Sequence, residues 1–408
     1  MRLLAFAAAM FIAFAAPGCA SEVNDLLSRH LYAGSLAEGD RELLPLAQSA
    51  DPAKAAEAEA ARGMLVFAAA VERLGQALHR HGLETPQSRM MTLPILRLPV
   101  PPNPQPQKLD YPKFRTILQN LVEDLTAAEA HLAAVGGNGV KLSVDLLQVR
   151  LDLDDDGKAG DYETLGAMMQ ALSQAPAPGG AGMAISFDTA DIYWLRGYAQ
   201  FIMAAAEFTL AHDFQSSFDK TFHMFFPNAG LPLADELRRP LAEGRFSEGA
   251  IGDAIAFIHL MSWPVVEPTR LANVRVRLKA MAALSRQSWQ AARTETDNER
   301  EWLPNAKQTG ALTTLPVTDQ TIDGWLAVMQ EFELILDGKK LVPHWRFDRG
   351  MNVKRMFEES KRFDLVLLMT GTDAALYLED GPLSSSGDWN SLMGVFQGNF
   401  LGYALWFN

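Results

Sequence analysis

Apolar residues recur three or four positions apart over most of the chain, and this spacing predicts amphipathic helices. In the N-terminal quarter, Asp51 and Pro52 form a start signal, because aspartate caps a first turn and proline fits the first helical position. Gly82 is expected to end that helix. Pro112 starts the next one, which should run to the glycines at 136–139.

The strongest helical pattern begins after Asp188, with Asp191 three residues on in the arrangement of a capping box. Residues 198–210 are apolar on almost every side, so we expect this helix at the centre of the core. Further helices are expected at residues 214–225, 248–261, 268–294 and 318–336. A hairpin is the alternative for the end of the last helix, with residues 334–336 paired to 340–342.

Three stretches depart from the helical pattern. Residues 84–112 are rich in proline and also aliphatic, which predicts an extended strap packed on the body; a proline-rich ligand for a partner domain is the alternative. Residues 140–153 partly alternate with period two, with one slip that fits a β-bulge. The last seventy residues alternate short apolar runs with turn signals, which indicates a small mixed subregion.

Together these patterns predict a mainly α protein, an irregular multi-helix array with a small β or mixed subregion near the C-terminus. A segment of proline, glycine and alanine at residues 175–182 is a candidate boundary. We therefore expect an N-terminal helical region at 21–174, which includes the strap, and a C-terminal helical region at 183–408 with a mixed tail. The length of 408 residues fits two or three domains or one large helical array.

The first twenty residues have the features of an export signal: a positive charge at Arg2, a short apolar run, and then small residues. One processing route leaves Ser21 as the first residue. In the other route, residues 16–19 resemble a bacterial lipoprotein box and Cys19 becomes the acylated terminus. We expect an exported bacterial protein, periplasmic or lipid-anchored to the cell envelope, that meets a membrane only through Cys19.

The net charge and the cysteine content exclude several kinds of partner and site. The formal net charge is −13 and no run of lysine and arginine stands out, so nucleic acid is not an expected partner. Cys19 is the only cysteine, which excludes an intramolecular disulfide and a cysteine nucleophile or thiolate metal site in the mature protein. A metal cation and an unknown protein or envelope component remain as expected partners.

Residues 152–163 contain the largest concentration of candidate metal ligands in the sequence. Carboxylates occupy positions 1, 3, 5 and 12, a glycine occupies position 6, and position 7 offers its backbone carbonyl: Asp152, Asp154, Asp156, Glu163, Gly157 and Lys158. This pattern resembles the calcium loop of the EF-hand, in which oxygen ligands at these positions surround the ion. The resemblance implies calcium as the bound ion. An acidic solvated turn is the alternative.

The flanks of the loop qualify the resemblance. The preceding residues are expected to be extended, so the loop lacks an entering helix, whereas a following helix is expected at 162–172. One loop with one following helix resembles a half-hand of the dockerin type, covering residues 152–175. Ala159 stands where a paired EF-hand has a β-branched residue, and the sequence holds no second loop.

Four other titratable residues are candidates with mainly structural interpretations. Glu207 lies in an apolar run, so it needs a partner or a raised pKa, and a salt bridge to an arginine is expected. Asp191 fits a helix cap, and His212 at the end of the central helix suits the helix dipole. His344, followed by tryptophan and arginine, is expected to pack structurally.

These residues lead to one functional expectation and one alternative. No metalloprotease, di-iron, nucleophile-elbow or phosphate-loop motif occurs in the sequence, so we lean away from an enzyme. We expect a calcium-binding protein that is a binding or scaffolding component of the cell envelope. The alternative is an envelope hydrolase that uses Glu207 or Asp191 as its acid or base.

Export should remove the first 18 to 20 residues, because signal peptidases read an apolar run that ends in small residues. Intact mass of the protein from an envelope fraction checks this. An acyl mass on Cys19 would select the lipoprotein route, and a retained Met1 would contradict export.

Overall fold

The computed structural model describes residues 21–84, 96, 98–137, 139–168, 184–237, 248–311, 315–385, 389, 393–396 and 399–407. The predicted signal at 1–20 and the predicted boundary at 175–182 lie outside these residues, and the division into two regions stays a prediction. Within the described ranges the chain is mainly helical, with three small antiparallel sheets. The predicted fold class is therefore confirmed.

Helix α3 begins at its predicted cap, and α4 begins one residue before the predicted proline. Their bounds are α1 (Glu22–Ala33), α2 (Leu36–Ala47), α3 (Pro52–Arg80) and α4 (Tyr111–Ala134). Asp51 caps α3 by accepting the Ala53 amide at 3.0 Å, and Asp110 caps α4 by accepting the Lys113 amide at 2.9 Å. Gly82, just past α3, has a φ of +68°, which a residue without Cβ adopts at little cost.

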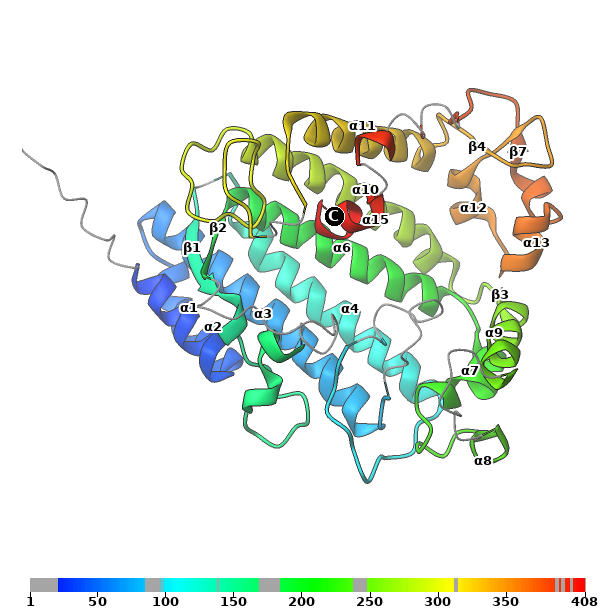
Figure 1. The fold of residues 1–408 in the computed structure, drawn as a ribbon, viewed down its shortest axis with the longest axis horizontal. Helices are drawn as coiled ribbons and strands as arrows, with labels where there is room; N and C mark the ends of the chain where they lie inside the picture. Colours follow the sequence, from blue (N-terminus) through cyan, green and yellow to red (C-terminus); the bar gives the residue numbers. More distant parts are fainter. Residues whose placement is uncertain are drawn as a thin grey trace, which may run out of the picture.

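Helix α6 (Thr189–Ala211) lies at the centre of a row of long helices, as its all-round apolar pattern predicts. Each helix packs on the next in chain order: α3 on α4, α4 on α6, α6 on α10 (Pro268–Ala292), and α10 on α11 (Asp319–Leu336) (Figure 1). The capping box is present, because the Ala190 amide donates to Asp188 and the Asp188 amide donates to Asp191. Local capping chemistry thus fixes where the central helix begins.

Glu207 of α6 has the salt bridge expected of a carboxylate in an apolar helix. Its side chain is buried, and its oxygens lie 2.8 Å from Arg270 Nη1 and 3.5 Å from Arg277 Nη2, both on α10. Arg270 also bonds to Gln119 of α4. This polar cluster therefore joins the three helices around the centre of the core.

The segment before the acidic loop forms one strand of a two-stranded antiparallel sheet. Strand β1 (Lys141–Asp145) pairs antiparallel with β2 (Ala184–Asp188), which the sequence patterns did not predict. The slip in the alternation is not a bulge. It is a 3₁₀ turn, Leu146–Gln148, because the Asp145 side chain accepts the Leu147 amide at 3.1 Å and turns the chain.

Most of the remaining elements form the other end of the molecule and the predicted mixed tail, whereas the C-terminal helix α15 lies against α6 and α10 (Figure 1). The helices are α7 (Gln215–Thr221), α8 (Ala234–Leu237), α9 (Glu248–Leu260), α12 (Val353–Glu359), α13 (Leu365–Thr370) and α15 (Phe400–Phe407). The strands are β3 (Ser262–Pro264) with β6 (Arg362–Asp364), and β4 (Val342–Pro343), β5 (Gly350–Met351) and β7 (Leu378–Glu379). Because β4 pairs with β5 and α11 continues to Leu336, the hairpin alternative is wrong.

Residues 98–110 of the proline-rich segment contain no helix, and the last two residues of the predicted strap, 111 and 112, belong to α4. Leu98 and Val100 pack on a core rich in phenylalanine from α4 and α7, including Phe114 and Phe218. Residues 85–95 and 97 lie outside the description. Among the described residues, no helix combines the length and the apolar character needed to cross a membrane.

Replacing Glu207 with alanine should destabilise the protein by about 1.5–3 kcal/mol, because two partly buried guanidinium groups lose their shared carboxylate, although Arg270 keeps its ion pair with Glu267. Urea unfolding monitored by circular dichroism measures the difference. Glu333→Ala is the matched control, since Glu333 bonds to the half-exposed Arg286 and its loss should cost about 0–1 kcal/mol. Equal costs for the two variants would contradict a central role for Glu207.

Candidate metal site

Residues 152–163 form a loop whose two flanks are paired with each other. The Leu151 amide donates to the Glu163 carbonyl at 3.1 Å, and the Leu165 amide donates to the Val149 carbonyl at 2.7 Å. The entering flank is extended, as predicted. The exit is a 3₁₀ turn, Asp161–Glu163, followed by a helical turn at 165–168, beyond which the predicted helix leaves the described residues. Backbone pairing therefore closes the loop at its base.

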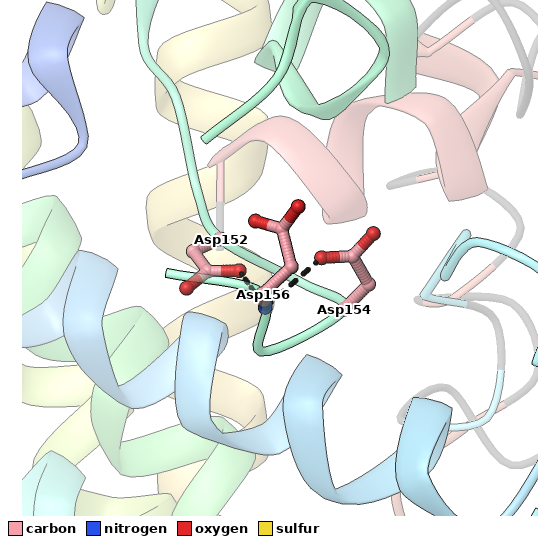
Figure 2. A group of neighbouring side chains, drawn as sticks. All are labelled: Asp152, Asp154 and Asp156. Atoms are coloured by element: carbon pink, nitrogen blue, oxygen red, sulfur yellow. Dashed lines mark hydrogen bonds between the residues drawn. The ribbon is translucent and has the colours of Figure 1, made fainter. Parts of the chain in front are cut away.

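Asp152, Asp154 and Asp156 converge inside this loop (Figure 2). One carboxylate oxygen from each lies within 4.8 Å of the others, a spacing at which the three could share a metal ion. The Asp156 amide donates to Asp152 and to Asp154 at 3.2 Å each, and the Gly157 amide donates to Asp152 at 3.1 Å. Gly157 has a φ of +84°, the turn that its position requires.

The three clustered aspartates carry negative charge that nearby cations do not neutralise. Among the described residues, no lysine or arginine forms an ion pair with Asp152, Asp154 or Asp156. The two arginines at the loop bond to other aspartates instead, Arg80 to Asp155 and Arg150 to Asp161. Burial raises the pKa of Asp152, and the charge of Asp154 adds to the rise. A bound cation would relieve this repulsion.

Glu163 lies against the start of the loop and is fully buried. One oxygen accepts the Leu153 amide at 2.6 Å and the Asp154 amide at 3.2 Å, and the other accepts the Gly160 amide at 2.7 Å. Glu163 is outside the group of three close carboxylates. Its predicted role as a ligand, like that of the exposed Lys158 through its carbonyl, stays a prediction.

Helix α3 contributes two residues to the loop that the sequence analysis missed. The Asp152 amide donates to Glu72 at 2.8 Å, and the Gln76 side chain donates to the Asp152 carbonyl at 2.9 Å. Burial raises the pKa of Glu72 to about 7, and the charges of Asp152 and Glu163 contribute to the rise. The spacing of four places Glu72 and Gln76 on one helix face, but nothing local relates that face to a loop eighty residues away.

Tyr162 supplies a further contact that the sequence did not indicate. Its hydroxyl donates to Asp154 Oδ2 at 2.7 Å. This hydrogen bond raises the pKa of Tyr162 to about 12, because an ionised phenol would lose its donor and repel the carboxylate. The contact holds one of the three clustered carboxylates in place.

Helix α1 covers the loop at the position where a paired EF-hand would meet a second loop. Gly34 ends α1 with a φ of +70°, and a Cβ built on it would lie 2.5 Å from the Cβ of Ala159. The Arg150 amide also donates to the Leu31 carbonyl at 2.9 Å. The end of α1 thus lies directly against Ala159, and this close approach requires glycine at position 34.

The two candidate histidines make hydrogen bonds to backbone carbonyls. His344 lies within hydrogen-bond distance of the Leu368 carbonyl, and the two residues after it donate to the next two carbonyls, so the run caps the end of α13. His212 contacts the Phe208 carbonyl at 2.6 Å. Burial lowers the pKa of His212, so this hydrogen bond, rather than a positive charge at the helix dipole, secures it.

A cavity of about 150 Å³ lies between α3 and α4, away from the candidate catalytic residues. Its wall includes Leu74, Ile117 and Asn120, together with the ion pair of Arg73 and Asp124. Neither Asp191 nor Glu207 lines it, so this cavity offers no substrate site to the acids that the hydrolase alternative requires.

Glu163→Ala should destabilise the protein by about 2–4 kcal/mol even in the presence of a chelator, because it removes the acceptor of three backbone amides. Asp156→Asn is the control: it keeps an oxygen for the Lys158 amide and should change stability in chelator by less than about 0.5 kcal/mol. Urea unfolding in chelator checks both. A cost for Glu163→Ala no larger than for Asp156→Asn would show that the amides find other partners.

The structure thus brings together three of the predicted ligands, places Glu163 beside them, and adds Glu72, Gln76 and Tyr162. The loop depends on α1 and α3 as well as on its own sequence. No protein-family model, curated protein or solved structure matches this chain, so the role of the loop rests on its own residues and contacts.

Proposed function

We propose that the protein binds one calcium ion in the loop at residues 152–163. The ligands are Asp152, Asp154, Asp156, the Lys158 carbonyl and Glu163. One observation carries the proposal: three carboxylates meet within 4.8 Å in a loop closed by its own backbone, and no described lysine or arginine pairs with them. Such a concentration of negative charge favours a cation over an empty turn.

Calcium fits this ligand set better than the common alternatives. The site offers oxygen atoms and no histidine or cysteine, which disfavours zinc, copper and iron. Magnesium demands a compact octahedral shell and keeps several waters, so it is usually held by one or two carboxylates. Three or four carboxylates on a curled loop suit the larger, more variable shell of calcium.

The surroundings of the loop support a single half-hand, similar to the dockerin type, over a paired EF-hand. The entering flank is extended, and α1 covers Ala159 where a second loop would pair. A site without a paired partner is expected to bind calcium with a dissociation constant of about 10⁻⁵ to 10⁻³ M. Exported proteins can meet calcium at these concentrations.

The role of the ion in this proposal is structural. The loop is attached to α3 through Glu72 and Gln76 and to α1 through Leu31 and Gly34, so an ion that rigidifies the loop also holds these helices. The protein then acts as a binding or scaffolding component of the cell envelope, exported by its N-terminal signal.

The hydrolase alternative gains no support from the acids it would use. Glu207 is held by Arg270 and Arg277, and Asp191 accepts the amides of Asp188 and Leu303. Both side chains therefore have partners within the fold. We therefore place the calcium-dependent binding role first, and the hydrolase hypothesis stays a prediction.

Calcium should raise the thermal midpoint of the wild type by several degrees, because a ligand at a hundred times its dissociation constant adds about 2.7 kcal/mol to the free energy of unfolding. Melting curves of wild type and Asp156→Asn, each in calcium and in chelator, measure the effect. The variant removes one ligand charge and keeps the local hydrogen bond, so its shift should be much smaller. A magnesium series at the same concentrations tests the choice of ion.

Asp155→Asn is the matched control for that experiment. Asp155 lies in the same loop, bonds to Arg80 and has a φ of 63°, which asparagine tolerates. This variant should keep the calcium shift of the wild type. Identical wild-type melting curves in calcium and chelator would show that residues 152–163 are only an acidic turn.

A further inference from the structure

Large apolar side chains are exposed at the end of the molecule opposite α1 and α2, where α9 and α13 lie (Figure 1). Helix α9 presents three isoleucines at spacings of four and three, which places them on one helix face. Helix α13 is apolar from Leu365 to Met369, yet none of its residues is buried. We call the exposed set the distal face, and its members are Ile251, Ile255, Ile258, Trp345, Val366 and Met369.

Backbone contacts join α9, α13 and Trp345 into one continuous surface. The Leu365 amide, at the start of α13, donates to the Met261 carbonyl at 3.0 Å, and the Met261 amide donates to the Ile258 carbonyl at 3.2 Å. The end of α9 therefore adjoins the start of α13. At the other end of α13, the Trp345 indole N–H donates to the Met369 carbonyl at 3.0 Å. This bond satisfies the polar atom of the indole and holds the exposed ring in place.

The area of the distal face exceeds what a monomer usually leaves uncovered. Its side chains are exposed by 40% to 77%, and together they present on the order of 700 Å² to solvent, whereas the largest apolar patch of a typical monomer covers about 300–600 Å². Each partner buries about 800 Å² in a standard protein interface. The distal face thus has nearly the area of one side of such an interface.

The residue types of the distal face are those of the centre of a protein interface. Residues 251–260 and 365–370 contain one acid, Asp253, and no lysine or arginine. The centres of interfaces are depleted of charge and enriched in tryptophan and methionine. Trp345 and Met369, which lie beside each other, match this composition.

The charge at this end of the molecule differs from that of the chain as a whole. Residues 344–370 contain six lysines and arginines and four aspartates and glutamates, although the formal net charge of the chain is −13. Two copies of an acidic protein repel each other. This repulsion is weakest where the ends that are not acidic meet, and the distal face lies at such an end.

Charged residues near the distal face favour a second copy of the chain over a lipid surface. Asp348 and Arg349 follow Trp345 in the turn between β4 and β5, and Lys361 lies just before β6. All three are exposed, and none forms an ion pair with another described residue. A surface that carries both signs can meet itself across a twofold axis, with an acid of one copy facing a cation of the other. An anionic lipid surface would repel both Asp348 and the net negative charge of the chain.

We propose that the distal face is the contact between two copies of this chain related by a twofold axis. Helices α9 and α13 of one copy pack against the same helices of the other. Trp345 is the aromatic anchor of the contact, because a tryptophan that is already held in place loses little conformational entropy on binding. The contact does not depend on the proposed calcium loop.

Sedimentation velocity of the protein purified from cells, over about 1–100 µM, measures this association. We expect a dimer with a dissociation constant in the micromolar range or tighter, and the same value in calcium and in chelator. A wild type that stays monomeric over the whole range would overturn the proposal. Open-ended polymers in place of a dimer would overturn the twofold arrangement.

Ile258→Glu and Met369→Glu should each weaken the dimer at least about tenfold, because each places a charge inside the contact. Leu44→Glu is the matched control: Leu44 is 42% exposed, against 43% for Ile258, and it belongs to α2 at the opposite end of the molecule (Figure 1). The control should associate as the wild type does. Unchanged dissociation constants in both distal-face variants, or equal weakening in Leu44→Glu, would overturn the assignment to this face.

Hydrogen exchange of the wild type tests the contact without any substitution. Peptides from residues 251–260 and 365–370 should be more protected at the highest of these concentrations than at the lowest, while peptides of α2 stay unchanged. Equal protection at both concentrations would contradict the contact. Vesicles of phosphatidylcholine and phosphatidylglycerol test the lipid alternative: binding by the wild type that Ile258→Glu abolishes would assign the distal face to a lipid surface and overturn the proposal.

Discussion

The arrangement of the helices depends on α6, which is apolar on nearly every side and therefore needs cover from several neighbours. Helices α4 and α10 supply that cover on either side of it. Its C-terminal half contains one buried acid, Glu207, and a buried carboxylate without partners is costly. Arg270 and Arg277 of α10 pair with this carboxylate, so charge pairing fixes how α10 lies along α6.

Two buried carboxyl groups are stabilised in different ways in this protein. Glu207 is paired with guanidinium groups of α10, and Glu163 accepts three backbone amides of its own loop. The first arrangement joins two helices, whereas the second closes the acidic loop on itself. Both meet the requirement that a buried polar group has partners.

The acidic loop joins parts of the N-terminal half as well as forming a candidate metal site. Its first aspartate is attached to α3 by two hydrogen bonds, and the end of α1 rests on Ala159. An ion that rigidifies this loop would therefore also help to hold α1 and α3 in place. These attachments support the structural role that our proposal gives to calcium.

The sequence by itself determined most of the long helices, the caps of α3 and α6, and the acidic loop, because these depend on residues a few positions apart. Asp51 and Asp188 cap helices that begin at the next residue, and Gly157 adopts the positive φ of its own turn. Only the tertiary structure decided the pairing of β1 with β2 and the attachment of Glu72 to the loop. Each of these joins segments that are distant in sequence, and such contacts exist only after the long helices have packed.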